Sequence, residues 1–325
     1  QSYVLEKPIL VGNGSLKGLL DSSTIDRAHY PAVANAFLKY KSFGPDFWAD
    51  VSVRSADFGG ANAIKDLRTT VEVGHVTKNF GPMLVALKQK IADPNVQTIR
   101  SARDLAKLTQ DEWVGLINAN GGQVPPNTDG QAASDKVQTY AATLVSQSER
   151  MFPDVALVAS VARSANNPLP NVKGVQALMD AHPDLDLRTG NLDIFVKQQN
   201  IDVDEATLTE ARVLQRVHRI APTAAMGQAL LDNKIHNSSQ IVAMGKDQFV
   251  ATLTKDKKID PRTAMTVYGF AEYQYAQVLQ RITDYRFDLH RADPKAIVDH
   301  TYTKAELPPE LAAVPNLETL FGSLD

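Results

Sequence analysis

The chain has 325 residues and no cysteine, and its 34 basic and 37 acidic side chains leave a formal net charge of −3. Hydrophobic residues make up 43% and charged residues 22%, a balance typical of globular proteins with a buried core. The lack of cysteine excludes disulfides and thiolate metal sites, and the slight negative charge argues against nucleic acid as a partner.

Apolar residues recur mostly at helical spacing, and strand-like alternation is rare, so the sequence predicts an all-α fold. No stretch reaches the roughly 20 apolar residues of a membrane-spanning helix, so we expect no transmembrane segment. The first expected helices are a short one capped by Ser15, one over residues 30–41 and one around Phe47 and Trp48. Further helices are expected over residues 82–91, 134–152, 155–163, 172–181, 192–196, 204–220, 223–231 and 261–285.

The last of these helices has the clearest pattern. Asp260 and Pro261 form a cap and first-turn pair, because the missing N–H of proline falls where a helix leaves N–H groups unpaired. One apolar stripe follows at offsets of three, four and seven, which predicts a helix packed along its length: Ala264, Val267, Tyr268, Ala271, Tyr275, Val278, Leu279 and Ile282.

Residues 164–171, with two prolines and three asparagines, oppose helix and strand alike. A chain of this length is too long for one ordinary core. We therefore expect two helical domains, residues 1–165 and 166–325.

An internal repeat links residues 101–117 to residues 237–253, a shift of 136 positions. Apolar or aromatic residues coincide along it, with Trp113 on Phe249, and each copy contains a break, at Thr109 or Gly245. Each is followed by a long helix. The repeat predicts a helical array of stacked short-helix and long-helix units.

The histidines do not form a zinc-protease pair, because no two have i, i+4 spacing with an intervening glutamate. His218 fits a core-edge imidazole with a hydrogen-bond partner. Asp299 and His300 are adjacent, and neighbouring side chains usually diverge, so a catalytic dyad is disfavoured. The full set is His29, His75, His182, His218, His236, His290 and His300.

Two groups of carboxylates resemble functional sites. Asp184 and Asp186 resemble the start of a calcium loop, but Arg188 and Thr189 stand where the loop needs other residues, so we interpret the pair as caps of the following helix. Asp202, Asp204 and Glu205 precede a helix, where negative charge stabilises the helix dipole.

Two glycine breaks and two tryptophans have structural interpretations. Gly12 to Ser15 lacks the Gly-Lys-Ser/Thr ending of a phosphate-binding loop, so it predicts a turn into a short helix. Ile241 to Gly245 resembles half of a helix-hairpin-helix motif, for which packing of Phe249 is the simpler explanation. Trp48 and Trp113 are expected to be core anchors. The sequence predicts no catalytic, cofactor-binding or metal-binding residue.

The C-terminal run Pro315 to Asp325 (PNLETLFGSLD) resembles a signature of the A component of bacterial insecticidal toxin complexes and related virulence-plasmid A proteins. Fainter similarity extends through residues 214–222, 235–249 and 105–126. In that family a cysteine- and histidine-rich motif follows the signature. The first residue is Gln1 and no signal-peptide pattern follows it, so we expect a segment of a longer protein.

The resemblance implies a helical shell segment of a large, secreted or surface-borne, pentameric pore-forming protein. Its partners would be the rest of the parent chain, further copies in a homo-oligomer, and a host-surface receptor or glycan. We therefore expect a non-enzymatic scaffold that contributes to assembly or recognition, without cofactors. Two alternatives stay open: a hydrolytic or lytic module using Asp184, Asp202 and Asp299, and a helical adaptor that binds a partner protein.

Overall fold

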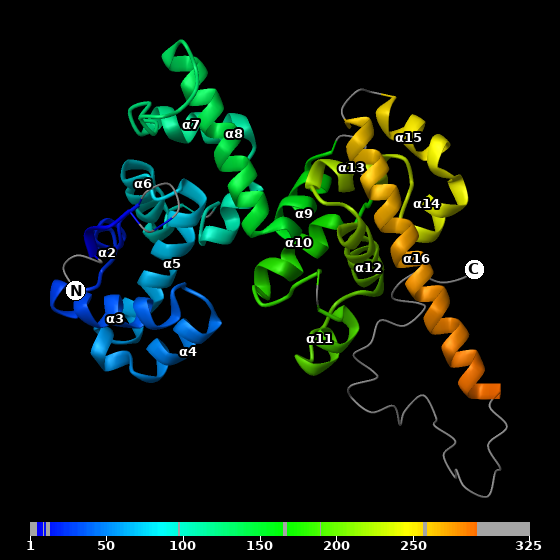
Figure 1. Ribbon diagram of the computed structural model, residues 1–325, viewed down its shortest axis with the longest axis horizontal. Coiled ribbons are helices and arrows are strands. Elements are labelled where there is room, and N and C mark those ends of the chain that lie inside the picture. Colours follow the sequence, from blue (N-terminus) through cyan, green and yellow to red (C-terminus); the bar gives the residue numbers. More distant parts are fainter. Residues whose placement is uncertain are drawn as a thin grey trace, which may run out of the picture. The chain divides into compact units, whose positions relative to one another are not determined.

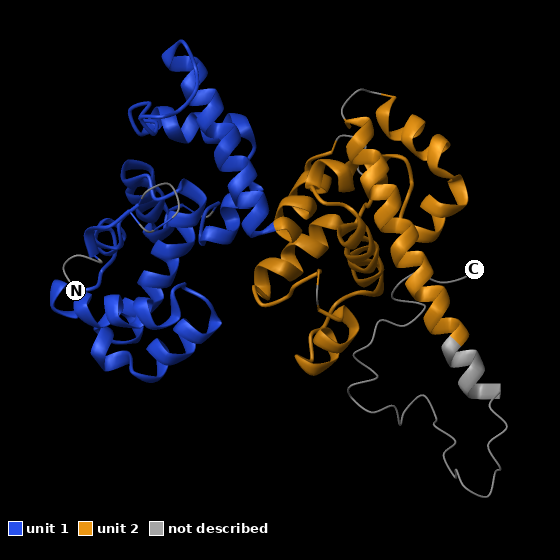
Figure 2. Ribbon diagram, in the orientation of Figure 1, with its two compact units in different colours: residues 1–152 blue, residues 153–325 orange. Residues whose placement is uncertain are grey.

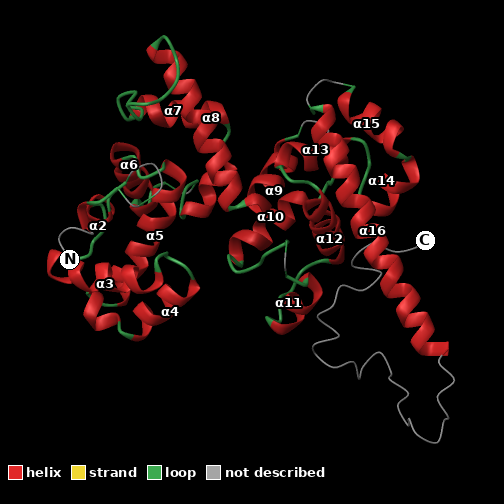
Figure 3. Ribbon diagram, in the orientation of Figure 1, coloured by secondary structure: helices red, strands yellow, loops and turns green. Residues whose placement is uncertain are grey.

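The computed structural model describes residues 5–8, 10, 14–96, 98–164, 168–188, 190–255 and 259–290, with side chains as far as residue 283. Every regular element in these ranges is an α-helix or a 3-10 helix (Figures 1 and 3), which confirms the expected all-α fold. None of the helices within these ranges is long and apolar enough to cross a membrane. The chain divides into two compact units, residues 1–152 and 153–325 (Figure 2).

The first unit is built around α5, which contacts α2, α4, α6, α8 and the 3-10 helices η3 and η4. Its core includes the fully buried Phe47, Leu67 and Trp113. The elements are α2 (Leu16–Asp21), η2 (Arg27–His29), α3 (Tyr30–Tyr40), α4 (Pro45–Val53), η3 (Ser55–Phe58), α5 (Ala61–Thr77), α6 (Gly81–Ala92), η4 (Ala102–Lys107), α7 (Gln110–Ala119) and α8 (Ala133–Met151).

The second unit packs α9 against α10, α12 and α13, and packs α14 and α15 against the first half of the long helix α16. Leu157, Leu214 and Phe249 are among its buried residues. The elements are α9 (Pro153–Arg163), α10 (Val172–Ala181), α11 (Leu192–Gln198), α12 (Glu205–Ile220), α13 (Ala224–Asp232), α14 (Ser238–Met244), α15 (Lys246–Thr254) and α16 (Pro261–His290).

The boundary between the units lies between Phe152 and Pro153, not at the expected joint after residue 165. Residues 165–167 are outside the described ranges, and on either side of them α9 and α10 pack against each other within the second unit. The loop is also tied to α12, because the buried Glu210 carboxylate accepts hydrogen bonds from the Asn171 backbone N–H at 2.9 and 3.0 Å. Proline and asparagine marked a loop there, but its flanking helices share one core.

The predicted internal repeat is present in the structure. Shifted by 136 positions, η4 and α7 begin where α14 and α15 begin, and each copy ends against a long helix, α8 or α16. Trp113 and Phe249 are both fully buried. The cap is repeated as well: the Asp104 carboxylate accepts from the Arg100 N–H at 2.9 Å, and the Gln240 side-chain oxygen accepts from the His236 N–H at 2.7 Å.

The correspondence also reaches upstream of the predicted repeat, since the helix pair α5–α6 precedes the first copy and the pair α12–α13 the second. The last residues of α5 and α12 are as far apart in sequence as the first residues of α6 and α13. The buried positions then coincide: Met83, Leu84 and Leu87 in α6, and Met226, Gly227 and Leu230 in α13.

Gly227 allows α13 to pack closely against α9. A Cβ atom at Gly227 would lie 2.5 Å from the Leu157 Cδ1 atom, so the glycine makes room for that leucine. The equivalent position of α6 holds Leu84, itself buried. Equivalent positions of the two copies thus carry a large side chain in α6 and none in α13.

The long helix α16 buries most of its expected stripe. Ala264, Val267, Ala271 and Val278 are buried as the stripe requires. Leu279, at the edge of the stripe, is 43% exposed.

Candidate functional site

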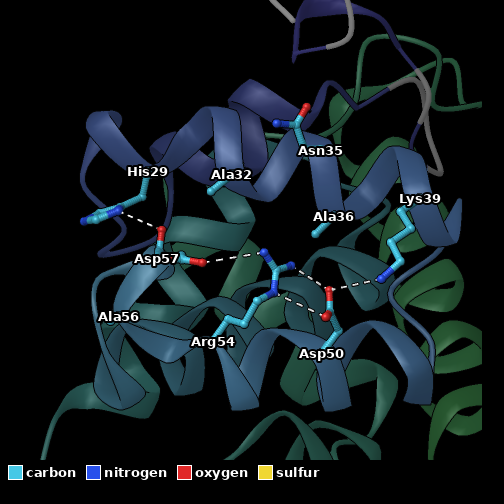
Figure 4. A pocket seen from close by; sticks show the side chains of 9 residues that line it. All are labelled: His29, Ala32, Asn35, Ala36, Lys39, Asp50, Arg54, Ala56 and Asp57. Atoms are coloured by element: carbon cyan, nitrogen blue, oxygen red, sulfur yellow. Dashed lines mark hydrogen bonds and ion pairs between the residues drawn. The ribbon is translucent and has the colours of Figure 1, made fainter.

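A groove between α3, α4 and η3 in the first unit has a volume of about 740 Å³. Its charged lining comes from η2, α3, the end of α4 and η3 (Figure 4): His29, Lys39, Asp50, Arg54 and Asp57. Ala32, Ala36 and Ala56 form its apolar wall.

The charged side chains of this groove are joined in one network. The Asp50 carboxylate accepts from the Arg54 guanidinium at 2.6 Å and lies 3.8 Å from the Lys39 ammonium, while Arg54 also lies 3.5 Å from Asp57. The His29 Nδ1 atom lies 2.8 Å from the Asp57 carbonyl oxygen. The hydrogen bond from Arg54 holds the pKa of Asp50 below its usual value.

This network determines what the groove can do chemically. Asp50 is held ionised by two cations, so it is a poor general acid, and the exposed ion pairs contribute little to stability. The arrangement fits a polar contact surface. The sequence analysis missed this groove, although the i, i+4 spacing of Asp50 and Arg54 and the i, i+3 spacing of Arg54 and Asp57 are typical of helical ion pairs.

The carboxylates considered from sequence are placed at helix starts and turns. Asp204 lies at the start of α12, as expected, and caps the helix by accepting from the Thr207 N–H at 2.8 Å. Hydrogen bonding to Thr207 lowers the pKa of Asp204. Glu205 instead forms an ion pair with Arg212 at 2.8 Å, and Arg212 also binds Asp193 at 2.7 Å.

The predicted caps of α11 need a correction. The cap is Asn191, whose side-chain oxygen accepts from the Ile194 N–H at 3.2 Å. Asp186 instead closes a turn by accepting from the Arg188 N–H at 2.7 Å. Asp184 and Asp202 are both exposed, one before α11 and the other before α12, and Asp299 and His300 lie outside the described residues.

Two buried polar side chains of α12 stand out in the second unit. His218 is 8% exposed, and its Nε2 atom has no hydrogen-bond partner among the described residues. Burial lowers the pKa of His218. Arg216 is 9% exposed, and its Nε atom has no partner within the described ranges either. Sequence analysis did not single out Arg216, because it sits in an ordinary helical pattern.

The remaining sequence candidates have structural roles. Ser15 caps α2 by accepting from the Gly18 N–H at 3.0 Å, Trp113 is a core anchor, and Phe249 packs 5.9 Å from the Tyr268 ring. Trp48 is partly buried and stacks on Phe43 at 6.0 Å, so it belongs to an aromatic cluster at the edge of the core.

No group of three or more His, Asp or Glu side chains in the described ranges is placed to hold a metal ion. No protein-family model, no curated protein and no solved structure matches the chain.

Proposed function

We propose that this chain is a non-enzymatic helical scaffold segment of a large toxin-complex-like virulence protein, acting in assembly or host-surface recognition. The observation that supports this most is the repeat of helix starts, caps and buried positions between η4–α7–α8 and α14–α15–α16. Repeated helical units of this kind build extended surfaces for binding other proteins.

The use of polar side chains supports the same proposal. Asp104, Asp204 and Gln240 accept backbone N–H groups at helix starts, and Glu210 anchors a loop. Their hydrogen-bonding capacity is used within the fold. The toxin-complex assignment, the secreted or cell-surface location and the homo-oligomeric partner rest on the resemblance of residues 315–325 and are part of the proposal.

The recognition part of the proposal is testable with the whole chain. Labelled chain should bind host cells or a glycan array saturably, and unlabelled chain should compete. Heat-unfolded chain is the control for non-specific adhesion. Absence of saturable binding by helical, monodisperse protein would leave only the assembly role.

The non-enzymatic part has a separate test. The chain should show no turnover on peptidoglycan, glycan and peptide substrates. Turnover that is lost in both Asp184→Asn and Asp202→Asn would contradict the proposal and favour the hydrolytic alternative.

A helical adaptor is a second candidate, and a specific observation favours it. The helix α16 carries large apolar side chains that are 43 to 62% exposed. Exposed apolar patches of this kind often mark protein-binding sites. The adaptor proposal predicts that this helix, rather than the charged groove, is protected when a partner protein binds.

A further inference from the structure

One side of α16 carries three large apolar residues that the fold leaves exposed. Met265, Phe270 and Tyr273 are 47, 53 and 62% exposed, and we call them the outer face of α16. Gly269 lies among them, with no heavy atom within 4 Å of the position of a Cβ atom. The exposed large apolar residues of the first unit, Leu38, Val53 and Val85, lie on three different helices.

The equivalent helix of the first unit shows that this apolar character is not required by the fold. Val137, Tyr140, Ala141 and Leu144 of α8 have the same spacing as Ala264, Val267, Tyr268 and Ala271 of α16, and all eight are buried. In that register Gln138, Thr143 and Ser146 of α8 correspond to Met265, Phe270 and Tyr273. The second copy has apolar side chains where the first has polar ones.

The size of the outer face discriminates between a second copy and a tethered segment as its occupant. Three large side chains that expose about half of their surface present roughly 300 Å². A stable dimer needs about 800 Å² on each partner, so this face is too small to hold a second copy firmly. A segment of the same chain needs far less area, because its effective concentration is roughly millimolar.

Residues 291–325 follow α16 directly and lie outside the described residues. Their sequence carries apolar residues three to four positions apart, ending in an adjacent pair: Leu307, Leu311, Val314, Leu317, Leu320 and Phe321. From Glu306 onward the charged residues are all acidic. The exposed Arg262 and Arg281 of α16 lie beyond the two ends of the outer face, so the charges are complementary.

The connecting residues are long enough for this contact. At about 1.5 Å per residue, Met265 lies roughly 38 Å along α16 from His290. Residues 291–306 can span up to about 50 Å when extended. We propose that residues 307–321 bind the outer face of α16 within the same chain and shield it from other copies.

The absence of cysteine gives a direct test, since two introduced thiols are the only ones in the chain. The full-length double variant Tyr273→Cys/Leu317→Cys should form an intrachain disulfide at least tenfold faster than the control pair Val53→Cys/Leu317→Cys. Val53 is 87% exposed, so the control thiol is fully accessible. Equal rates, or disulfides that form mainly between chains, would overturn the proposal, and the second result would make another copy the occupant.

A second measurement does not depend on disulfide geometry. In the full chain, Leu311→Ser/Leu317→Ser should free the outer face and raise the fluorescence of a dye that binds apolar surface at least threefold. Adding Phe270→Ser and Tyr273→Ser should remove that rise. The control Ala312→Ser/Thr319→Ser should leave the signal unchanged. No rise in the first variant, or a rise that persists without Phe270 and Tyr273, would refute the contact.

Discussion

The segments η4–α7–α8 and α14–α15–α16 carry out the same packing with different residues. Trp113 and Phe249 occupy equivalent buried positions in the two segments. Thr109 and Gly245 lie in equivalent turns, which they form in different ways. Thr109 caps α7 with its side chain, whereas Gly245 turns the chain with a φ of 79°, a conformation that favours glycine. The comparison teaches that buried positions and the cap of the first short helix are the same in both copies, whereas the cap of the second short helix differs.

The largest expected effect comes from removing the shared anchor. Trp113→Ala and Phe249→Ala should each lower the free energy of unfolding by about 3–5 kcal/mol, because each leaves a large cavity. Chemical denaturation should show each loss in the transition of its own unit. The exposed Asn118→Ala is the control and should change stability by less than about 0.5 kcal/mol. Equal losses in both transitions would contradict independent cores.

A somewhat smaller effect should come from Arg216, which is buried in α12 and whose Nε atom lacks a partner. Arg216→Met should raise the free energy of unfolding by about 1–4 kcal/mol, because an apolar side chain of similar length removes the cost of burying charge. Thermal denaturation measures the change. Lys246→Met, at an exposed position, is the control. A destabilised Arg216→Met would show that the guanidinium has a stabilising partner.

The repeated N-caps should contribute less. Asp104→Ala and Gln240→Ala should each cost about 0.5–2 kcal/mol, because each removes the acceptor of the Arg100 or His236 N–H at a helix start. Urea titration of both variants tests the equivalence, with the exposed Asn118→Ala as control. A loss at one site alone would show that the matching backbone geometry does not carry matching energy.

The smallest expected effect is a pH dependence. Because burial lowers the pKa of His218, the folded state favours neutral imidazole, and its stabilisation is present above about pH 6.5 and is lost as pH falls. His218→Gln should flatten the decline in unfolding free energy between pH 7 and pH 5. The equivalent His75 of α5 is exposed, so His75→Gln should flatten it less. Equal effects would contradict the difference in burial.

Much of the fold was predictable because apolar spacing and caps act locally. Helices expected at residues 134–152, 172–181 and 204–220 are present with bounds shifted by at most one residue. The 17-residue helix α5 was not predicted. It contains three threonines, three valines and Gly74, which have low helix propensity, and it is stabilised by burial on several sides.

The sites were less predictable, since they depend on contacts between distant residues. Sequence patterns placed Asp204 at the start of a helix, but the ion pairs of Asp193 and Glu205 with Arg212 depend on how the helices pack. The charged groove joins Lys39 of α3 to Asp50 of α4, which the sequence pattern of either helix does not indicate. Helical periodicity predicts which side of a helix is apolar, and it does not indicate what covers that side.

The contact between Gly227 and Leu157 has a consequence for how the two units can change. One copy has the buried Leu84 at this position of α6, and the other has Gly227 in contact with Leu157 of α9. Transplanting leucine alone into position 227 would overfill that space, whereas exchanging both contact partners together would conserve its volume. Side chains can therefore be exchanged between the two units only in matched sets, and the exchange of a single residue should destabilise the fold.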